Sequence, residues 1–127
     1  MGGGAVVTED GDTPGRAYHF RQSWIRHKLK ASPSQLRIMH VEGDSMVPTL
    51  QDGDAVLVDM TRQFPSPPGI FVLDDGMGLV AKRLEHIPNS DPPAGRVISD
   101  NTLYPAYERT ADEIRIIGRI RWFAREI

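Results

Sequence analysis

The sequence of 127 residues lacks cysteine, and this excludes disulfide bonds, a thiolate nucleophile and zinc sites built on thiolates. The absence also fits a reducing compartment, so we expect a cytoplasmic protein. No run of about 18 apolar residues and no signal-peptide pattern occurs, so the sequence predicts neither a membrane span nor secretion.

An excess of positive charge is also lacking, because the formal net charge is −2. Binding to the phosphates of nucleic acids needs a basic surface. A helix-turn-helix needs at least two packed helices, whereas only one helical segment is expected here. We therefore expect contact with DNA only through a DNA-binding domain that is missing from this chain.

Metal-ligand patterns are lacking as well. The four histidines, His19, His27, His40 and His86, do not stand in pairs at a ligand spacing. The sequence therefore predicts no metal site, and nothing in it indicates a cofactor.

What is present predicts one mostly β domain. Short apolar or alternating runs bounded by turn residues predict strands, and these runs are Leu36–Val41, Ala55–Asp59, Ile70–Leu73, Leu79–Leu84, Arg96–Ser99 and Ile114–Phe123. Tyr18–Leu29 predicts a short amphipathic helix. Residues 1–17, rich in glycine and acidic residues, are expected to be a flexible arm or linker remnant before a domain at 18–127.

Ser45 is a candidate nucleophile because it lies in a turn-rich segment between two predicted strands. A serine hydroxyl is a weak nucleophile at neutral pH and needs a base. Lys82 is the best candidate for that base. On its strand it shares a face with Val80 and Leu84, and an apolar setting lowers the pKa of an ammonium group. The alternative is a turn serine and a lysine with a solvated head group.

The same turn is the expected source of oxyanion contacts. Gly43, Asp44 and Met46 flank Ser45, and glycine lets the main chain approach a substrate closely. We favour a structural role for Met46, which suits an apolar gap beside the site.

Several ordered blocks together resemble the carboxy-terminal domain of LexA and phage CI-type repressors, the S24 serine-lysine peptidase family. The blocks are GDSMVPTL at 43–50, GDAVLV at 53–58, GIFVL at 69–73, VAKRL at 80–84, ISDN at 98–101 and IIGRIRW at 116–122. The 37 residues that separate Ser45 from Lys82 suit this family. The resemblance implies a fold of several coiled β-sheets, like that of LexA and signal peptidase.

The resemblance also implies a function. Such domains dimerise and cut their own chain when a RecA filament, formed during the SOS response to DNA damage, stabilises the cleavable conformation, and repression is then lost. By this resemblance we expect a homodimer, formed through the carboxy-terminal strand at Ile114–Phe123. That strand being central in the monomer's own sheet is an equal alternative.

The sequence departs from the family at the scissile bond, because no Ala-Gly or Cys-Gly precedes Ser45. The nearest substitutes are Asp10-Gly11 and Pro14-Gly15. Three hypotheses follow: a regulatory domain with a competent autopeptidase site, the same fold as a non-cleaving oligomerisation or sensing module, and a signal-peptidase relative. The last lacks the expected membrane anchor.

Overall fold

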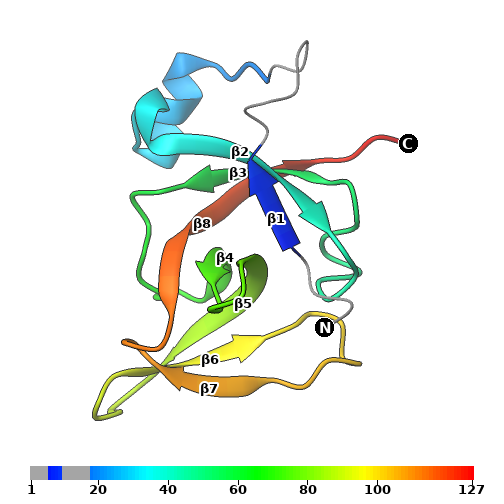
Figure 1. Ribbon diagram of the computed structural model, residues 1–127. Coiled ribbons are helices and arrows are strands. Elements are labelled where there is room, and N and C mark those ends of the chain that lie inside the picture. The colour runs from blue at the N-terminus through cyan, green and yellow to red at the C-terminus, as the bar shows by residue number, and fades with distance from the viewer. Residues whose placement is uncertain (1–5, 10–17) are drawn as a thin grey trace.

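The computed structural model describes residues 6–9 and 18–127 and consists mainly of β-strands (Figure 1). The strands are β1 (Val6–Glu9), β2 (Leu36–Glu42), β3 (Ala55–Asp59), β4 (Gly69–Asp74), β5 (Leu79–Ile87), β6 (Ala94–Ile98), β7 (Tyr107–Thr110) and β8 (Arg115–Ala124). Helical structure is limited to one π-helical segment, η1 (Trp24–Leu29), and one 3₁₀ turn, η2 (Pro33–Gln35). The expected mostly β fold with one short helical segment is confirmed.

The strands form one antiparallel sheet in the order β1-β2-β3-β8-β4-β5-β6-β7. An additional pair, Val6 with Val80, joins β1 to β5. Six strands therefore close into a ring, and β6 and β7 extend from it as a hairpin-like arm (Figure 1). The terminal strand β8 lies between β3 and β4. It is therefore central in the monomer's own sheet, which is one of the two alternatives that the sequence left open.

The predicted strands all form, with small changes at their ends. Two further strands were not expected. One is β7, which pairs with β6. The other is β1, in which Val6–Glu9, inside the range expected to be a flexible arm or linker remnant, pair with β2. The rest of that range, residues 1–5 and 10–17, lies outside the described residues.

The interior of the ring is apolar. The main cluster of buried side chains comprises Met39, Val41, Met46, Leu50, Val56, Val58, Val72 and Ala81. A second cluster, around Phe71, Leu73, Val80, Leu84 and Val97, lies where β4 and β5 meet β6. Because the two faces of β5 contribute to different clusters, this strand is covered on both sides.

The helical segment η1 covers the outer side of β2 and β3. Ile25 and Leu29, one helical turn apart, pack with Leu36 and Leu57 in a third cluster. The 3₁₀ turn η2 follows, and the backbone N–H of Ser32 donates to the side-chain oxygen of Gln35 at 3.0 Å. Ser32 thus stands at the N-cap of η2, and Pro33 occupies its first turn, where its missing N–H costs no hydrogen bond.

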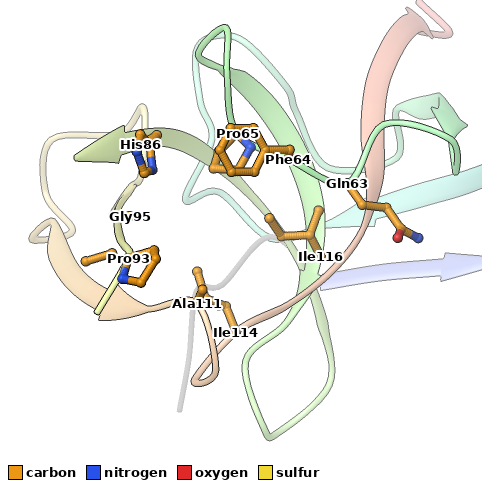
Figure 2. Close-up of a pocket in the computed structure, with 10 residues that line it drawn as sticks. Gln63, Phe64, Pro65, His86, Pro93, Gly95, Ala111, Ile114 and Ile116 are labelled. Carbon is orange, nitrogen blue, oxygen red and sulfur yellow. The ribbon is translucent and has the colours of Figure 1, made fainter. Parts of the chain in front are cut away.

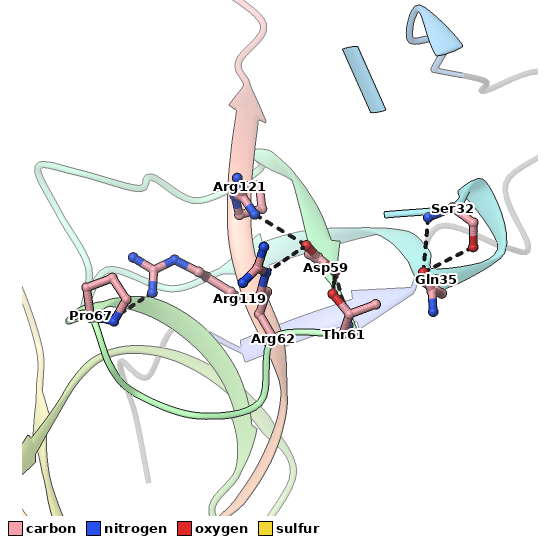
Figure 3. Close-up of polar contacts among 8 residues, drawn as sticks. All are labelled: Ser32, Gln35, Asp59, Thr61, Arg62, Pro67, Arg119 and Arg121. Carbon is pink, nitrogen blue, oxygen red and sulfur yellow. Dashed lines mark hydrogen bonds and ion pairs between the residues drawn. The ribbon is translucent and has the colours of Figure 1, made fainter. Parts of the chain in front are cut away.

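Contacts between β3 and β8 hold the ring together. A Cβ placed on Gly118 would lie 2.6 Å from the carbonyl oxygen of Asp59, so only glycine fits this close approach. The buried Asp59 carboxylate contacts Arg121 at 3.3 Å and accepts from the Thr61 hydroxyl at 2.6 Å (Figure 3). Arg119 reaches the other way, to the carbonyl oxygen of Pro67 (Figure 3).

A hollow of about 250 Å³ lies between the β3–β4 loop, β5 and the turn before β8 (Figure 2). Its walls are mostly apolar and include Phe64 and Ile116, with the His86 ring 5.4 Å from that of Phe64. Neither Ser45 nor Lys82 lines it. Among the described residues, no helix has the length and apolar character needed to cross a membrane.

Candidate active site

Ser45 lies in a short helical turn that follows β2. The chain enters this turn at Gly43, whose φ of 95° is a left-handed conformation that favours glycine. The turn then closes through the N–H of Leu50, which donates to the carbonyl oxygen of Met46 at 2.9 Å. Ser45 is 0% exposed, so its hydroxyl faces the interior and not the solvent.

Lys82 reaches Ser45 from the middle of β5. Its Nζ lies 3.1 Å from Ser45 Oγ, within hydrogen-bonding distance. The side chain is 8% exposed, and Val80 and Leu84, its neighbours on the same face of the strand, are buried in the second cluster. Phe71 stands directly opposite Lys82 on β4. The apolar setting that the alternation of β5 predicts is therefore present.

Ser99 completes the contacts of the lysine. Lys82 Nζ donates to Ser99 Oγ at 2.8 Å. Ser99 follows β6 directly, and the β5–β6 register, in which Arg83 pairs with Ile98, brings it opposite Lys82. Both serines are nearly inaccessible, so the lysine amine is enclosed between two hydroxyl groups.

The electrostatics of the site favour a neutral amine. Burial lowers the pKa of Lys82 below its ordinary value, and the charge of Asp75 opposes this effect only in part. Among the described residues, no carboxylate forms an ion pair with Lys82. The neighbouring Asp100 carboxylate is instead held by Arg83 through two hydrogen bonds of 2.8 Å, which lower the pKa of that carboxyl. A neutral Lys82 can accept the Ser45 proton.

The segment after β6 fixes the serine turn. The backbone N–H of Asn101 donates to the carbonyl oxygen of Ser45 at 3.0 Å, and its side-chain amide donates to that of Asp44 at 3.1 Å. The Tyr104 hydroxyl donates to the Asp44 carboxylate at 2.6 Å, and this bond raises the pKa of Tyr104. The Tyr104 ring centre lies 5.8 Å from Lys82 Nζ.

The residues expected around the oxyanion differ in their placement. The N–H of Gly43 donates to the Asp52 carboxylate at 2.8 Å and is therefore already engaged. Met46 is fully buried in the main cluster, which agrees with its structural role, and its sulfur accepts from the N–H of Asp100 at 3.4 Å. The carboxylate and the carbonyl oxygen of Asp44 both accept hydrogen bonds. Its backbone N–H remains as the candidate donor to the oxyanion.

Sequence reasoning missed the role of Ser99. Its only sequence signal is its position at the end of a predicted strand, inside the ISDN block. Two aspartates near the site are held mainly by arginines. Asp54 accepts from the N–H of Gln51 at 2.8 Å, but its main partner is Arg125. Asp100 accepts two hydrogen bonds from Arg83.

Metal chemistry has no evident ligand set here. Within the part of the chain that the structure describes, no three histidine, aspartate or glutamate side chains gather closely enough to hold a metal ion. The polar groups that meet at the site are hydroxyls and one amine.

Comparison with known proteins agrees with this geometry. The family model described as Peptidase S24-like matches residues 1–121. The 26 kDa repressor protein of Escherichia phage HK022 is 27% identical over 123 residues, which cover 94% of this chain and 51% of the repressor. The chain thus spans about half the length of that curated relative.

Proposed function

Because this chain belongs to the S24-like peptidase family, we propose that it is the regulatory domain of a transcriptional repressor and carries a serine autopeptidase site. The observation that carries the proposal is the 3.1 Å contact between Lys82 Nζ and Ser45 Oγ in a buried site where no carboxylate of the described residues pairs with the lysine. Burial without a carboxylate partner makes the charged form of a lysine costly and lowers its pKa. A general base needs this low pKa, because only the neutral amine can accept a proton.

In the proposed reaction, neutral Lys82 takes the proton of Ser45 as its oxygen attacks the carbonyl carbon of a peptide bond. Lys82 then gives that proton to the leaving amine nitrogen as the C–N bond breaks. Water hydrolyses the resulting ester of Ser45, with Lys82 again acting as base. Ser99 holds the amine in line with Ser45 through its 2.8 Å contact.

The scissile bond is proposed to lie in the chain's own segment before Ser45. The two nearest candidates, Asp10-Gly11 and Pro14-Gly15, lie outside the described residues. The strand β1 pairs with both β2 and β5, and these two strands carry the Ser45 turn and Lys82. A part of the segment before Ser45, β1 itself, therefore lies beside the two strands that carry the site, which supports cleavage in cis.

The wider role extends the resemblance to LexA and CI-type repressors. We propose a homodimer through β8, a DNA-binding domain that precedes this region in the full protein, and a RecA filament as the activator. The second half of β8 offers a surface for the dimer. Among the described residues, Ile120–Ala124 pair with β3 alone, so the other edge of this half can accept a partner strand.

One observation favours a second candidate function, a non-cleaving oligomerisation or sensing module. No Ala-Gly or Cys-Gly bond precedes Ser45 in this chain. In this alternative the serine-lysine pair is inherited structure and hydrolyses nothing.

The test separates the two functions by two readouts on the intact chain. The first is incubation between pH 7 and pH 11 followed by mass spectrometry, because high pH deprotonates Lys82 without an activator. The second is labelling with a serine-directed fluorophosphonate, which needs an activated hydroxyl but no scissile bond. We compare wild type with Ser45→Ala and Lys82→Ala, and use the exposed Ser66→Ala and Lys28→Ala as matched controls.

A single cut that both site variants abolish and both controls keep would establish autopeptidase activity and identify the bond. Labelling of Ser45 that depends on Lys82, without any cut, would establish a competent pair that lacks its substrate in this chain. If wild type is neither cut nor labelled at any pH while it dimerises normally, the autopeptidase proposal is wrong and the binding module stands.

A further inference from the structure

A second polar region surrounds the helical segment η1 and contains none of the residues of the serine-lysine site. Residues 18–41 contain no aspartate or glutamate, and their five lysines and arginines are Arg21, Arg26, Lys28, Lys30 and Arg37. The formal charge of the whole chain, −2, therefore conceals a strongly basic segment. Arg21, Arg26, Lys28 and Lys30 are exposed, three of them on or beside η1.

An aromatic cluster stands beside these charges. The rings of Phe20 and Trp24 are stacked, with centres 5.4 Å apart and planes inclined by 22°. Trp122, from β8, meets Phe20 edge-on at 4.8 Å. The three side chains are only partly buried, although they pack on the cluster below η1. Rings that are not fully covered leave apolar faces available for a ligand.

The charges and the rings line one open hollow of about 710 Å³. Phe20, Trp24 and Trp122 form its aromatic side, while Arg21, His27 and Lys28 contribute the basic groups. Among the described residues, no aspartate or glutamate lines it. This volume is within the range, about 300–1,000 Å³, of sites that hold small ligands.

We propose that this hollow binds a nucleotide unit of single-stranded nucleic acid. The base stacks on the aromatic side, and the phosphates lie against Arg21 and Lys28. Stacking on exposed rings together with a basic groove is how proteins bind single strands without reading their sequence. A base inside a duplex is already stacked on its neighbours, so it does not reach these rings.

An acidic peptide matches the charge but not the rings. Carboxylate side chains have no flat apolar face to cover Phe20, Trp24 and Trp122, whereas a base with its phosphate complements both features at once. The proposal is independent of the autopeptidase site, because Ser45, Lys82 and Ser99 do not line the hollow.

The chain provides its own probe for the test. Its only two tryptophans, Trp24 and Trp122, both line the hollow, so intrinsic fluorescence reports on this site directly. We would titrate the full chain with oligo-dT of 20 nucleotides, a duplex of equal length, thymidine monophosphate and polyglutamate. Binding of the single strand should quench the fluorescence, and its affinity should fall about sevenfold between 50 and 200 mM salt if Arg21 and Lys28 hold about two phosphates.

Two sets of variants test the basic and the aromatic side separately. The double variant Arg21→Glu with Lys28→Glu should weaken oligo-dT binding at least about tenfold. Its matched control is Arg109→Glu with Arg115→Glu, which makes the same change of charge at exposed positions outside the hollow and should change binding less than about twofold. Trp24→Leu should weaken binding about fivefold or more, and Trp24→Phe, which keeps a ring, clearly less.

The outcomes distinguish the ligands. If thymidine monophosphate competes at a concentration similar to that of the nucleotides in oligo-dT, a free nucleotide is enough to occupy the hollow. Equal losses in the two double variants would overturn the site, because the effect would then be one of overall charge. Tighter binding of the duplex or of polyglutamate would overturn the nucleotide assignment, and circular dichroism checks that each variant is folded.

Discussion

The protein treats its buried acids and its buried lysine in opposite ways. The carboxylates of Asp54 and Asp59 are 0% exposed, and each contacts an arginine, Arg125 at 2.7 Å and Arg121 at 3.3 Å. Lys82 is 8% exposed, and its hydrogen bonds among the described residues go to two hydroxyl groups. Each buried carboxylate therefore faces an arginine, whereas no described carboxylate forms an ion pair with the lysine.

The difference separates a carboxylate with a structural role from an amine suited to act as a base. Burial alone would raise the pKa of Asp54, but the hydrogen bonds from Arg125 and the N–H of Gln51 outweigh it and lower the pKa. For Lys82 burial is the leading cause and lowers the pKa. A paired carboxylate adds stability, and an unpaired ammonium removes it. The same cost of burying the ammonium lowers the pKa of the lysine, and a lysine base requires that lowered pKa.

Removing the arginine from a buried pair should have the largest effect. Arg125→Ala leaves the Asp54 carboxylate buried without a cation, so we expect a loss of about 3–5 kcal/mol in the free energy of unfolding, measured with urea at pH 7. Arg96→Ala is the control, because Arg96 and Glu85 are both half exposed at 3.7 Å, and we expect a change below about 1 kcal/mol.

The pH dependence of Arg125→Ala gives a second check. In wild type the pKa of Asp54 is below its unfolded value of 3.8, so its stabilisation is present at neutral pH and is lost as the pH falls through the folded pKa. Without Arg125, desolvation is opposed only by Gln51 and should raise the pKa, so the variant should gain stability as the pH falls from 7 toward 5. Equal losses in Arg125→Ala and Arg96→Ala would contradict the comparison.

Removing the unpaired charge should stabilise the protein. Lys82→Met keeps the length of the side chain and removes the buried amine, so we expect a gain of about 1–3 kcal/mol in the free energy of unfolding at pH 7. The control is Lys28→Met at an exposed position, which should change little.

The sign of the Lys82 effect with pH follows from proton binding. The folded pKa of Lys82 is below its unfolded value of 10.5, so between these two pH values the folded state binds fewer protons than the unfolded state. Wild-type stability should therefore rise with pH through this window, and the advantage of Lys82→Met should shrink. If Lys82→Met is less stable than wild type at pH 7, Lys82 is not the strained group that the comparison requires.

Local patterns in the sequence predict much of this architecture. The alternation of Val80, Lys82 and Leu84 predicts the apolar face on which the lysine lies, and the GDSM turn between two strands predicts a structured Ser45. A glycine inside an apolar strand, as at Gly118, is typical of a close backbone approach, and the structure shows that approach at Asp59. Each of these features depends on side-chain period or on backbone geometry over a few residues.

The remaining features depend on partners far along the chain. Arg125 lies 71 residues from Asp54, and Ser99 comes to Lys82 through the pairing register of β5 and β6. Strand β7, Tyr107–Thr110, has no apolar alternation and forms beside β6. No local rule of period or spacing identifies such pairs, because the register of the whole sheet decides them.

A smaller effect is expected from the second hydroxyl at Lys82. Ser99→Ala removes one acceptor of the ammonium, so the charged form becomes less favourable and the pKa of Lys82 should fall further. Fluorophosphonate labelling of Ser45 should then begin at lower pH, while its maximal rate falls because the amine is less well positioned. The cost in stability should be about 1 kcal/mol. Ser99→Thr keeps the hydroxyl and should retain the wild-type pH profile; a profile unchanged in Ser99→Ala would exclude a positioning role.

The smallest effect is expected where the hydrogen bond is exposed. Tyr104→Phe removes the hydroxyl that donates to Asp44 at 2.6 Å, but water can replace it there, so the free energy of unfolding should change by less than about 1 kcal/mol. The ring that stands 5.8 Å from Lys82 Nζ remains, so the pH profile of Ser45 labelling should also stay as in wild type. Tyr104→Leu removes the ring as well and serves as the matched variant. A large loss of labelling in Tyr104→Phe would mean that the Asp44 contact, more than the contacts of Asn101, holds the serine turn in place.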